Sequence, residues 1–233
     1  MERRTFTALS LLSLAFPLFS RSSLAQQTKA APHRSATPAP LSASEVVDKV
    51  QAFYDQLRTF KANFKQHYRI KSHDKTMDSA GWVIFQKPGK MSWRYTSNGN
   101  RVVSDGKVIK IYEKANKQML EQPLNTSQYP AVLSFLTGQG KLKQNFKFTL
   151  QSSAQMNYTA GHVLLGEPLH PTAAYERVYF YVDARSFQVR RVIIVDAQQN
   201  RNRFDFEAPQ GNTKPPKGEF AFTPPPGTQV IRP

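Results

Sequence analysis

Residues 85–95 read FQKPGKMSWRY, and this stretch decides how the surrounding chain is interpreted. The pair Pro88-Gly89 is a typical turn signal, and apolar and polar residues alternate after it. A period of two places successive side chains on opposite faces of a strand. The stretch therefore predicts a β-hairpin whose second strand has one apolar face, formed by Met91, Trp93 and Tyr95.

The same pattern extends along the chain beyond this hairpin. Further turn signals stand at Asn98-Gly99, Asp105-Gly106 and Ala115-Asn116, and β-type runs continue from Phe146 to Phe206. The sequence contains about ten such runs at close spacing, with no helix between most of them. This arrangement argues against a parallel α/β fold and predicts a mainly β protein with a curled antiparallel sheet.

Two helices are expected outside the strands. The first begins near Ser44, whose side chain can accept a hydrogen bond from the first turn. Its apolar residues follow helical spacing and are Val46, Val50, Phe53, Leu57 and Phe60. The second lies between Leu124 and Leu142 and ends at Gly138. Its apolar residues are Val132, Leu133, Phe135 and Leu136. The first stripe is typical of core packing, whereas the second helix either packs on the sheet or covers something.

The N-terminal part of the chain is expected to lie outside the fold. Residues 1–25 combine the basic pair Arg3-Arg4, an apolar stretch shorter than a bilayer span and the small residues Ser23-Leu24-Ala25. We expect a signal peptide, with the Sec and twin-arginine routes both open. Residues 26–41 are rich in proline and poor in large apolar groups, and we expect a flexible linker. Residues 42–233 then form a single domain.

Composition narrows the possible chemistry. The chain has no cysteine, which excludes disulfides, thiolate metal sites, cysteine nucleophiles and acylation of an N-terminal cysteine. Its 32 Lys+Arg outnumber its 16 Asp+Glu, for a formal charge of +16. The expected signal peptide contains three Arg and one Glu, so its removal leaves +14. This excess suits attraction to anionic membrane or partner surfaces. We expect no nucleic acid, because strand alternation places aromatic and basic side chains on opposite faces.

Motifs for catalysis are missing from the sequence. Its five histidines are scattered without metal-ligand spacing, and no nucleotide, dinucleotide or serine-hydrolase motif occurs. We therefore expect no catalysis, no metal and no cofactor.

Three stretches resemble the outer-membrane lipoprotein carrier family, LolA. They are the hairpin region from Phe85 to Tyr112, the segment FKANFKQ at residues 60–66, and FAFTPPPGTQVI at residues 220–231. The last looks like the family's C-terminal signature F-x-F-x-P-P-x-G-x-x-V. The resemblance spans roughly Ser44 to the C-terminus. It implies a periplasmic carrier built as an unclosed antiparallel β-barrel of about ten to eleven strands, covered by a helical lid.

The resemblance also implies a hydrophobic cavity for the acyl chains of lipoproteins. Strand alternation then predicts its lining as Met91, Trp93, Tyr95, Ile109, Ile111, Val178, Phe180, Val182, Phe204 and Phe206. The lid and its seat are expected to be Val46, Val50, Phe53, Leu57, Val132, Leu133, Phe135 and Leu136.

One position departs from the family pattern. The family typically has an Arg immediately before the proline of the first hairpin, and that Arg bonds to the lid. Here Lys87 precedes Pro88. Lysine keeps the charge but lacks the planar fork of arginine, so we expect Lys87 and Pro88 to form a weaker lid latch.

The partners implied by the resemblance are acylated lipoproteins as cargo, an inner-membrane ATP-dependent lipoprotein-releasing transporter as donor and an outer-membrane lipoprotein receptor as acceptor. Transient contact with a membrane surface and a monomeric carrier are expected. Two alternatives stay open: a carrier of another envelope lipid, and a β-rich envelope enzyme or scaffold that carries nothing.

Overall fold

The computed structural model describes residues 40–124, 138 and 140–233. The expected signal peptide and nearly all of the expected linker lie outside this range, as does the second predicted helix with Val132, Leu133, Phe135 and Leu136. Residues from Pro40 to Pro233 form one compact unit.

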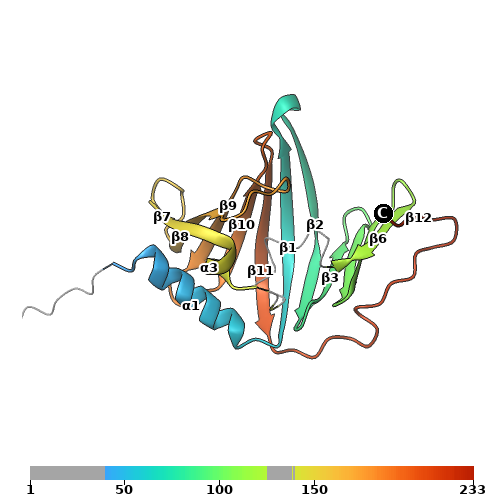
Figure 1. The fold of residues 1–233 in the computed structure, drawn as a ribbon, viewed down its shortest axis with the longest axis horizontal. Coiled ribbons are helices and arrows are strands. Elements are labelled where there is room, and N and C mark those ends of the chain that lie inside the picture. The colour runs from blue at the N-terminus through green and yellow to red at the C-terminus, as the bar shows by residue number, and fades with distance from the viewer. Residues whose placement is uncertain (1–39, 125–137, 139) are drawn as a thin grey trace, which may run out of the picture. The chain divides into compact units, whose positions relative to one another are not determined.

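The described part of this unit contains a 12-stranded sheet, two helices and the 3-10 turn η1 (Figure 1). The helices are α1 (Ala43–Asp55) and α3 (Leu142–Asn145), and the turn is η1 (Lys71–His73). The strands are β1 (Thr59–Ile70), β2 (Lys75–Gln86), β3 (Lys90–Tyr95), β4 (Arg101–Asp105), β5 (Val108–Glu113), β6 (Gln118–Pro123), β7 (Phe146–Gln151), β8 (Gly161–Pro168), β9 (Arg177–Asp183), β10 (Val189–Val195), β11 (Arg201–Gly211) and β12 (Gln229–Ile231).

The sheet is unclosed, as expected. Its strand order is β12-β6-β5-β4-β3-β2-β1-β11-β10-β9-β8-β7, so β12 and β7 form its two edges. All neighbours are antiparallel except β12, which runs parallel to β6. The long β1 and β2 hairpin stands at the centre, and β1 pairs with β11 on its other side. The sheet has one or two strands more than the ten to eleven expected, because β1 and the three-residue β12 were not among the predicted runs.

Strand register gives the sheet two chemically different faces. Trp93 of β3 pairs with Val83 and Val102, and all three point to the face that we call the inner face. This face joins α1 in one continuous apolar core. The opposite, outer face carries many charged side chains on β1, β3 and β11, including Lys65, Arg94 and Asp205.

Helix α1 begins and ends earlier than predicted. Ser42, not Ser44, is its N-cap, and Ser42 and Glu45 bond reciprocally as a capping box. The helix ends at Asp55, so Phe60 does not extend its apolar stripe and lies instead in β1. Its buried side chains are Val46, Val47, Val50 and Tyr54. The Tyr54 hydroxyl accepts a 3.1 Å hydrogen bond from the backbone N–H of Val189, which fixes α1 against β10.

The outer face of β2–β6 is crossed by residues 212–228, which we call the C-terminal strap. It leaves β11 and leads into β12 (Figure 1). On the way, Glu219 and Phe222 accept hydrogen bonds from side chains of β3, β4 and β5. A separate apolar cluster lies on the outer face of β8–β10, where Val163, Tyr181, Ile193 and Val195 pack with Met156 and Tyr158. The strap and this cluster both bury apolar side chains that point away from the main core.

Candidate functional site

The inner face is dominated by aromatic rings around Trp93. Its indole lies with ring centroids 4.9 Å from Phe64, 5.3 Å from Phe204 and 5.8 Å from Phe85, each in an edge-on arrangement. Such pairs stabilise by about 1 kcal/mol beyond their buried area. The Trp93 ring nitrogen is buried and has no hydrogen-bond partner among the described residues. Among the described residues, the side chains packed around Trp93 are therefore mainly aromatic and apolar.

The ten residues predicted to line a cavity all contribute to this inner core. Nine are buried, and Ile111 is partly buried and packs against them. They come from both halves of the sheet: Met91, Trp93, Tyr95, Ile109 and Ile111 from β3 and β5, and Val178, Phe180, Val182, Phe204 and Phe206 from β9 and β11. The fold therefore brings together residues that lie up to about 115 positions apart in the sequence.

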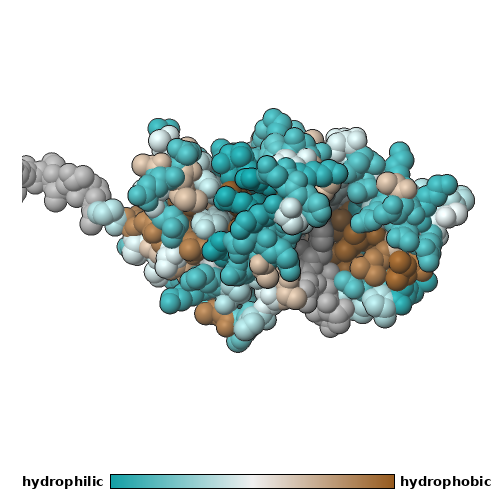
Figure 2. All heavy atoms as spheres, turned by 90° about the horizontal axis from the view of Figure 1, so that it is seen from above, coloured by the Kyte–Doolittle hydropathy of each residue, from teal (hydrophilic) through white to brown (hydrophobic). Residues whose placement is uncertain are grey.

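A hollow of about 590 Å³ opens beside this core. Two of the predicted residues, Tyr95 and Ile111, line it together with Val102, Met77 and Tyr68. The rest of its wall is mostly polar and consists of Gln66, Asp78, Ser79, Asn98, Asn100, Tyr112, Glu113 and Asn202. The hollow thus joins an apolar floor to a polar rim. Figure 2 shows apolar side chains gathered on the side of the molecule where β3–β6 lie.

Sequence reasoning missed several residues of this site. Phe64 and Gln66 on β1 face the core and the hollow respectively, and Phe85 on β2 lies against Trp93. The alternation of Phe60, Ala62 and Phe64 could have revealed β1 as a strand with an apolar face. Of the residues predicted for the lid and its seat, Val46 and Val50 of α1 are buried in the core. Phe53 of α1 and Leu57, which follows the helix, pack against it.

Lys87 reaches the C-terminal end of α1. Its ammonium donates hydrogen bonds to the carbonyl oxygens of Tyr54, at 2.6 Å, and Asp55, at 3.4 Å. These carbonyls belong to the last turn of the helix, where a cation also complements the helix dipole. Burial lowers the pKa of Lys87, against the opposing effect of the Asp55 charge. Lys87 thus connects the first hairpin to the seat helix, with Pro88 in a cis peptide bond beside it.

Gly138 lies directly against the Lys87 side chain. A Cβ atom placed on Gly138 would meet the Lys87 Cδ and Cγ at 2.9 and 3.0 Å. Its φ of +73° is also a conformation that favours glycine. The only residue type that leaves Lys87 undisturbed at this position is therefore glycine.

A polar ladder fixes α3 to α1 next to this contact. Lys141 pairs with Asp55 at 3.0 Å, and Lys143 pairs with Asp48 at 2.6 Å. Between them, the backbone N–H of Leu142 donates to the Gln51 side chain at 2.9 Å. The ladder holds the chain at α3 onto the exposed side of α1, close to the Lys87 contact.

The described residues contain no group of three or more His, Asp or Glu arranged to hold a metal ion. None of the helices within residues 40–124 and 140–233 has the length and apolar character needed to cross a bilayer. An unclosed sheet with an aromatic inner face, a helix seated on that face and a hollow with a polar rim are features expected of a binding protein for ligands with large apolar parts.

Comparison with known proteins identifies the family. The sequence model described as "Outer membrane lipoprotein carrier protein LolA" matches residues 55–223. The chain belongs to this family. Proteins named outer-membrane lipoprotein carrier protein are similar to it: that of Cupriavidus pinatubonensis is 25% identical over 198 residues, covering 83% of this chain and 90% of the relative. That of Nitrosomonas europaea is 25% identical over 196 residues, covering 84% and 92%.

A solved structure agrees with the fold. The crystal structure of an uncharacterized conserved protein from Thermus thermophilus superposes with a TM-score of 0.50 at 13% identity. The match covers 82% of this chain and 99% of that one. This likeness concerns the fold alone.

Proposed function

We propose that this protein is a periplasmic carrier that holds lipoproteins by their acyl chains on the inner face of its sheet. Membership of the LolA family supports the carrier role. In this proposal the cargo arrives from an inner-membrane ATP-dependent transporter and is passed to an outer-membrane lipoprotein receptor. No catalytic step is required.

The single observation that carries the proposal is the apolar inner face. Its buried cluster joins residues from α1 and from strands in both halves of the sheet. Acyl chains need a surface without polar groups, since burying an unpaired polar group is costly. The inner face meets this need over its whole centre, and the hollow at Tyr95 and Ile111 offers a starting point at its rim.

Entry of acyl chains requires the inner face to open. The central side chains pack on one another and are almost completely buried, with Trp93 and Phe180 both 1% exposed. Cargo therefore replaces contacts between side chains with contacts to acyl chains, which are chemically similar. The contacts of Lys87 with α1 link the first hairpin to the seat helix, and we propose that they act as the latch that opposes this opening.

The test is to purify the mature protein from periplasm and to identify its bound material by mass spectrometry. Bound acylated protein is the expected result. Free lipid alone would favour a carrier of another envelope lipid, and the absence of both in protein taken from actively exporting cells would refute the carrier role.

Site-specific crosslinking tests whether the cargo binds to the inner face of the sheet. A photoreactive residue at Ile111, on the inner face, is expected to crosslink to lipoprotein. The matched control is a photoreactive residue at Asn63, which is exposed on the outer face of β1. Equal crosslinking at both positions would refute the assignment of cargo to the inner face.

A further inference from the structure

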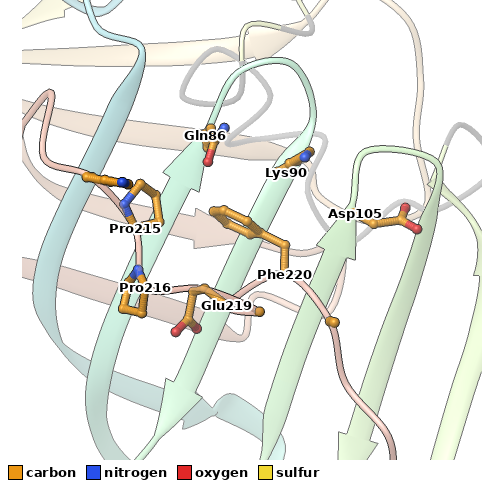
Figure 3. A pocket seen from close by; sticks show the side chains of 10 residues that line it. Gln86, Lys90, Asp105, Pro215, Pro216, Glu219 and Phe220 are labelled. Carbon is orange, nitrogen blue, oxygen red and sulfur yellow. The ribbon is translucent and has the colours of Figure 1, made fainter.

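The C-terminal strap leaves a pocket between itself and the outer face of the sheet. The pocket has a volume of about 440 Å³, which is within the range of ligand pockets. It is lined by Gln86, Lys90 and Asp105 from the sheet and by Lys214, Pro215, Pro216, Gly218, Glu219, Phe220 and Ala221 from the strap (Figure 3). A second hollow of about 250 Å³ shares Asp105, Phe220 and Ala221 with it, so one groove follows the strap.

The groove is built on fixed contacts. At its start, Thr59 donates a 2.7 Å hydrogen bond to the carbonyl oxygen of Thr213. In the middle, the buried Glu219 carboxylate accepts from Ser92, Arg94 and Arg101. At its far end, Lys110 donates to the carbonyl oxygen of Phe222 at 3.1 Å. Because the strap is held to the sheet at three places, the pocket near Pro215 and Pro216 has a fixed shape.

Two lysines in this pocket have no ion pair within the described part of the chain. The Lys90 ammonium lies 6.0 Å from the centre of the Phe220 ring, and Lys214 is exposed. Lys217, in the strap between two lining residues, and Lys107, in the turn after Asp105, add two more exposed cations. The four lysines make this end of the outer face strongly positive.

The two carboxylates of the pocket are already engaged. Asp105 accepts hydrogen bonds from the backbone N–H groups of Lys107, at 2.8 Å, and Val108, at 2.9 Å. Glu219 is enclosed by its partners, with its side chain only 2% exposed. Neither carboxylate reaches Lys90 or Lys214 within ion-pair distance. Asp105 keeps its negative charge and lies opposite Lys90 in the strand register, so it offsets part of the positive charge. Because Lys107, Lys214 and Lys217 are also exposed here, the net charge offered to a ligand is still positive.

The pocket walls supply apolar surface and a hydrogen-bonding amide in addition to positive charge. Pro215, Pro216 and Phe220 give rigid apolar surfaces on one side, and Figure 3 shows the Phe220 ring between the prolines and Lys90. Gln86 supplies an amide that can both donate to and accept from a peptide backbone. A flat anionic membrane would reach the exposed lysines but would leave this concave wall unused.

We propose that the groove beneath the C-terminal strap binds an extended acidic peptide segment of a partner protein, with carboxylates at Lys90 and Lys214 and an apolar side chain against Phe220 and the prolines. The groove lies on the outer face and the proposed cargo on the inner face. Docking of this partner is therefore independent of the cargo and does not rest on the proposed function.

The test uses the full mature chain and fluorescence anisotropy of a labelled peptide of sequence EFEEFEE, with QFQQFQQ as its neutral counterpart. The acidic peptide is expected to bind about tenfold more tightly than the neutral one, and its affinity is expected to fall with added salt. Reversal of the two pocket charges in Lys90→Glu/Lys214→Glu is expected to weaken binding about tenfold. Amide NMR signals of Gly218 and Ala221 are expected to shift on titration.

The matched control reverses two lysines elsewhere, in Lys75→Glu/Lys147→Glu. Both are exposed, and neither has an ion pair in the described structure. It is expected to bind the acidic peptide within about twofold of the wild type. Equal weakening in pocket and control variants would overturn the proposal, because binding would then follow total charge alone.

Two further outcomes would also overturn it. One is equal affinity for the acidic and neutral peptides. The other is binding to phosphatidylglycerol vesicles that depends on Lys90 and Lys214 without any binding of the acidic peptide, which would make the groove a membrane contact. Circular dichroism checks folding, and Lys90→Gln/Lys214→Gln replaces the reversal variant if that variant does not fold.

Discussion

Replacement of Glu219 by glutamine is expected to destabilise the protein substantially, although the two side chains have nearly the same shape. Glu219 lies in the C-terminal strap, and its carboxylate accepts from the Ser92 hydroxyl at 2.5 Å and from Arg94 at 3.2 Å. Arg101 donates to it at 3.4 Å and to its backbone carbonyl at 3.3 Å. The substitution removes the negative charge that lies between the cations Arg94 and Arg101.

The expected loss of stability follows from the burial of Glu219 and Arg101. The side chains of Glu219 and Arg101 are 2% and 9% exposed, so the charge on Arg101 would lose its buried counterion. Burial already lowers the pKa of Arg101, and the nearby charge of Arg94 lowers it further, while Glu219 opposes both effects. Breaking a buried pair costs about 3–5 kcal/mol. Arg94 is 43% exposed and the glutamine oxygen still accepts hydrogen bonds, so we expect a loss of about 2–4 kcal/mol in the free energy of unfolding.

The assay is equilibrium unfolding in urea, followed by tryptophan fluorescence and by circular dichroism. The matched control is Glu167→Gln, because Glu167 is exposed on β8 and forms no ion pair with a described residue. We expect that control to change stability by less than about 0.5 kcal/mol. A loss at Glu219 no larger than that of the control would refute the reasoning, since it would show that the strap is held by its apolar contacts alone.

Three further predictions concern the latch region and one turn. Lys87→Met removes the hydrogen bonds to the end of α1 and is expected to lower the free energy of unfolding by about 1–2 kcal/mol and to speed uptake of a fluorescent fatty acid, whereas Lys87→Arg retains most of the stability. Gly138→Ala forces a left-handed conformation on alanine and displaces Lys87, so thermal unfolding is expected to show a loss of about 1–2 kcal/mol and uptake to accelerate as in Lys87→Met. Unchanged uptake in both variants would contradict the latch. Backbone hydrogen bonds lower the pKa of Asp105 below its ordinary value of 3.8, so its carboxylate stabilises the fold above that pH and the contribution is lost as pH falls through the lower, folded value. Urea titrations of Asp105→Asn at a series of pH values should therefore show a smaller acid-induced loss than wild type, and an identical pH profile would contradict this assignment.

Local alternation made much of the sheet predictable. The FQKPGKMSWRY stretch does form a hairpin, with Gly89 at a positive φ of 68° in its turn. Met91, Trp93 and Tyr95 are buried on one face, as their spacing indicates. Such positions are predictable because burial on one face of an antiparallel strand leaves a period of two in the sequence.

The predicted boundary between α1 and β1 was wrong for a physical reason. Leu57 and Phe60 continue the helical spacing of Val46 and Val50, but Phe60 also begins the alternating run of β1. A short overlap can satisfy both periods, and tertiary packing then decides between them. The start of α1 was recoverable, because Ser42 and Glu45 have the spacing of a capping box.

The strap contacts could not be read from the sequence. Glu219 meets Ser92 and Arg101 across separations of 127 and 118 residues, and nothing in the local pattern of either segment specifies the other. Contacts of this kind depend on where the chain passes after β11. A latch role for Lys87 was predicted only from the family resemblance, because its acceptors are backbone carbonyls of α1 and carry no side-chain signal.

The packed state of the inner face bears directly on how a carrier releases its cargo. Each methylene moved out of water gains about 0.8 kcal/mol, so acyl chains of lipoproteins would be held very tightly by an empty, preformed apolar cavity. Here the side chains of the face already bury one another, with Met91, Trp93 and Phe180 each 1% exposed. Binding of acyl chains must break these contacts first, and that cost is subtracted from the gain. Net affinity is thereby reduced toward that of a membrane, which is the condition for passing cargo on without an energy source of the carrier's own. Variants that weaken the closed packing without removing apolar surface, such as Lys87→Met, should consequently take up acyl chains more readily and release them more slowly.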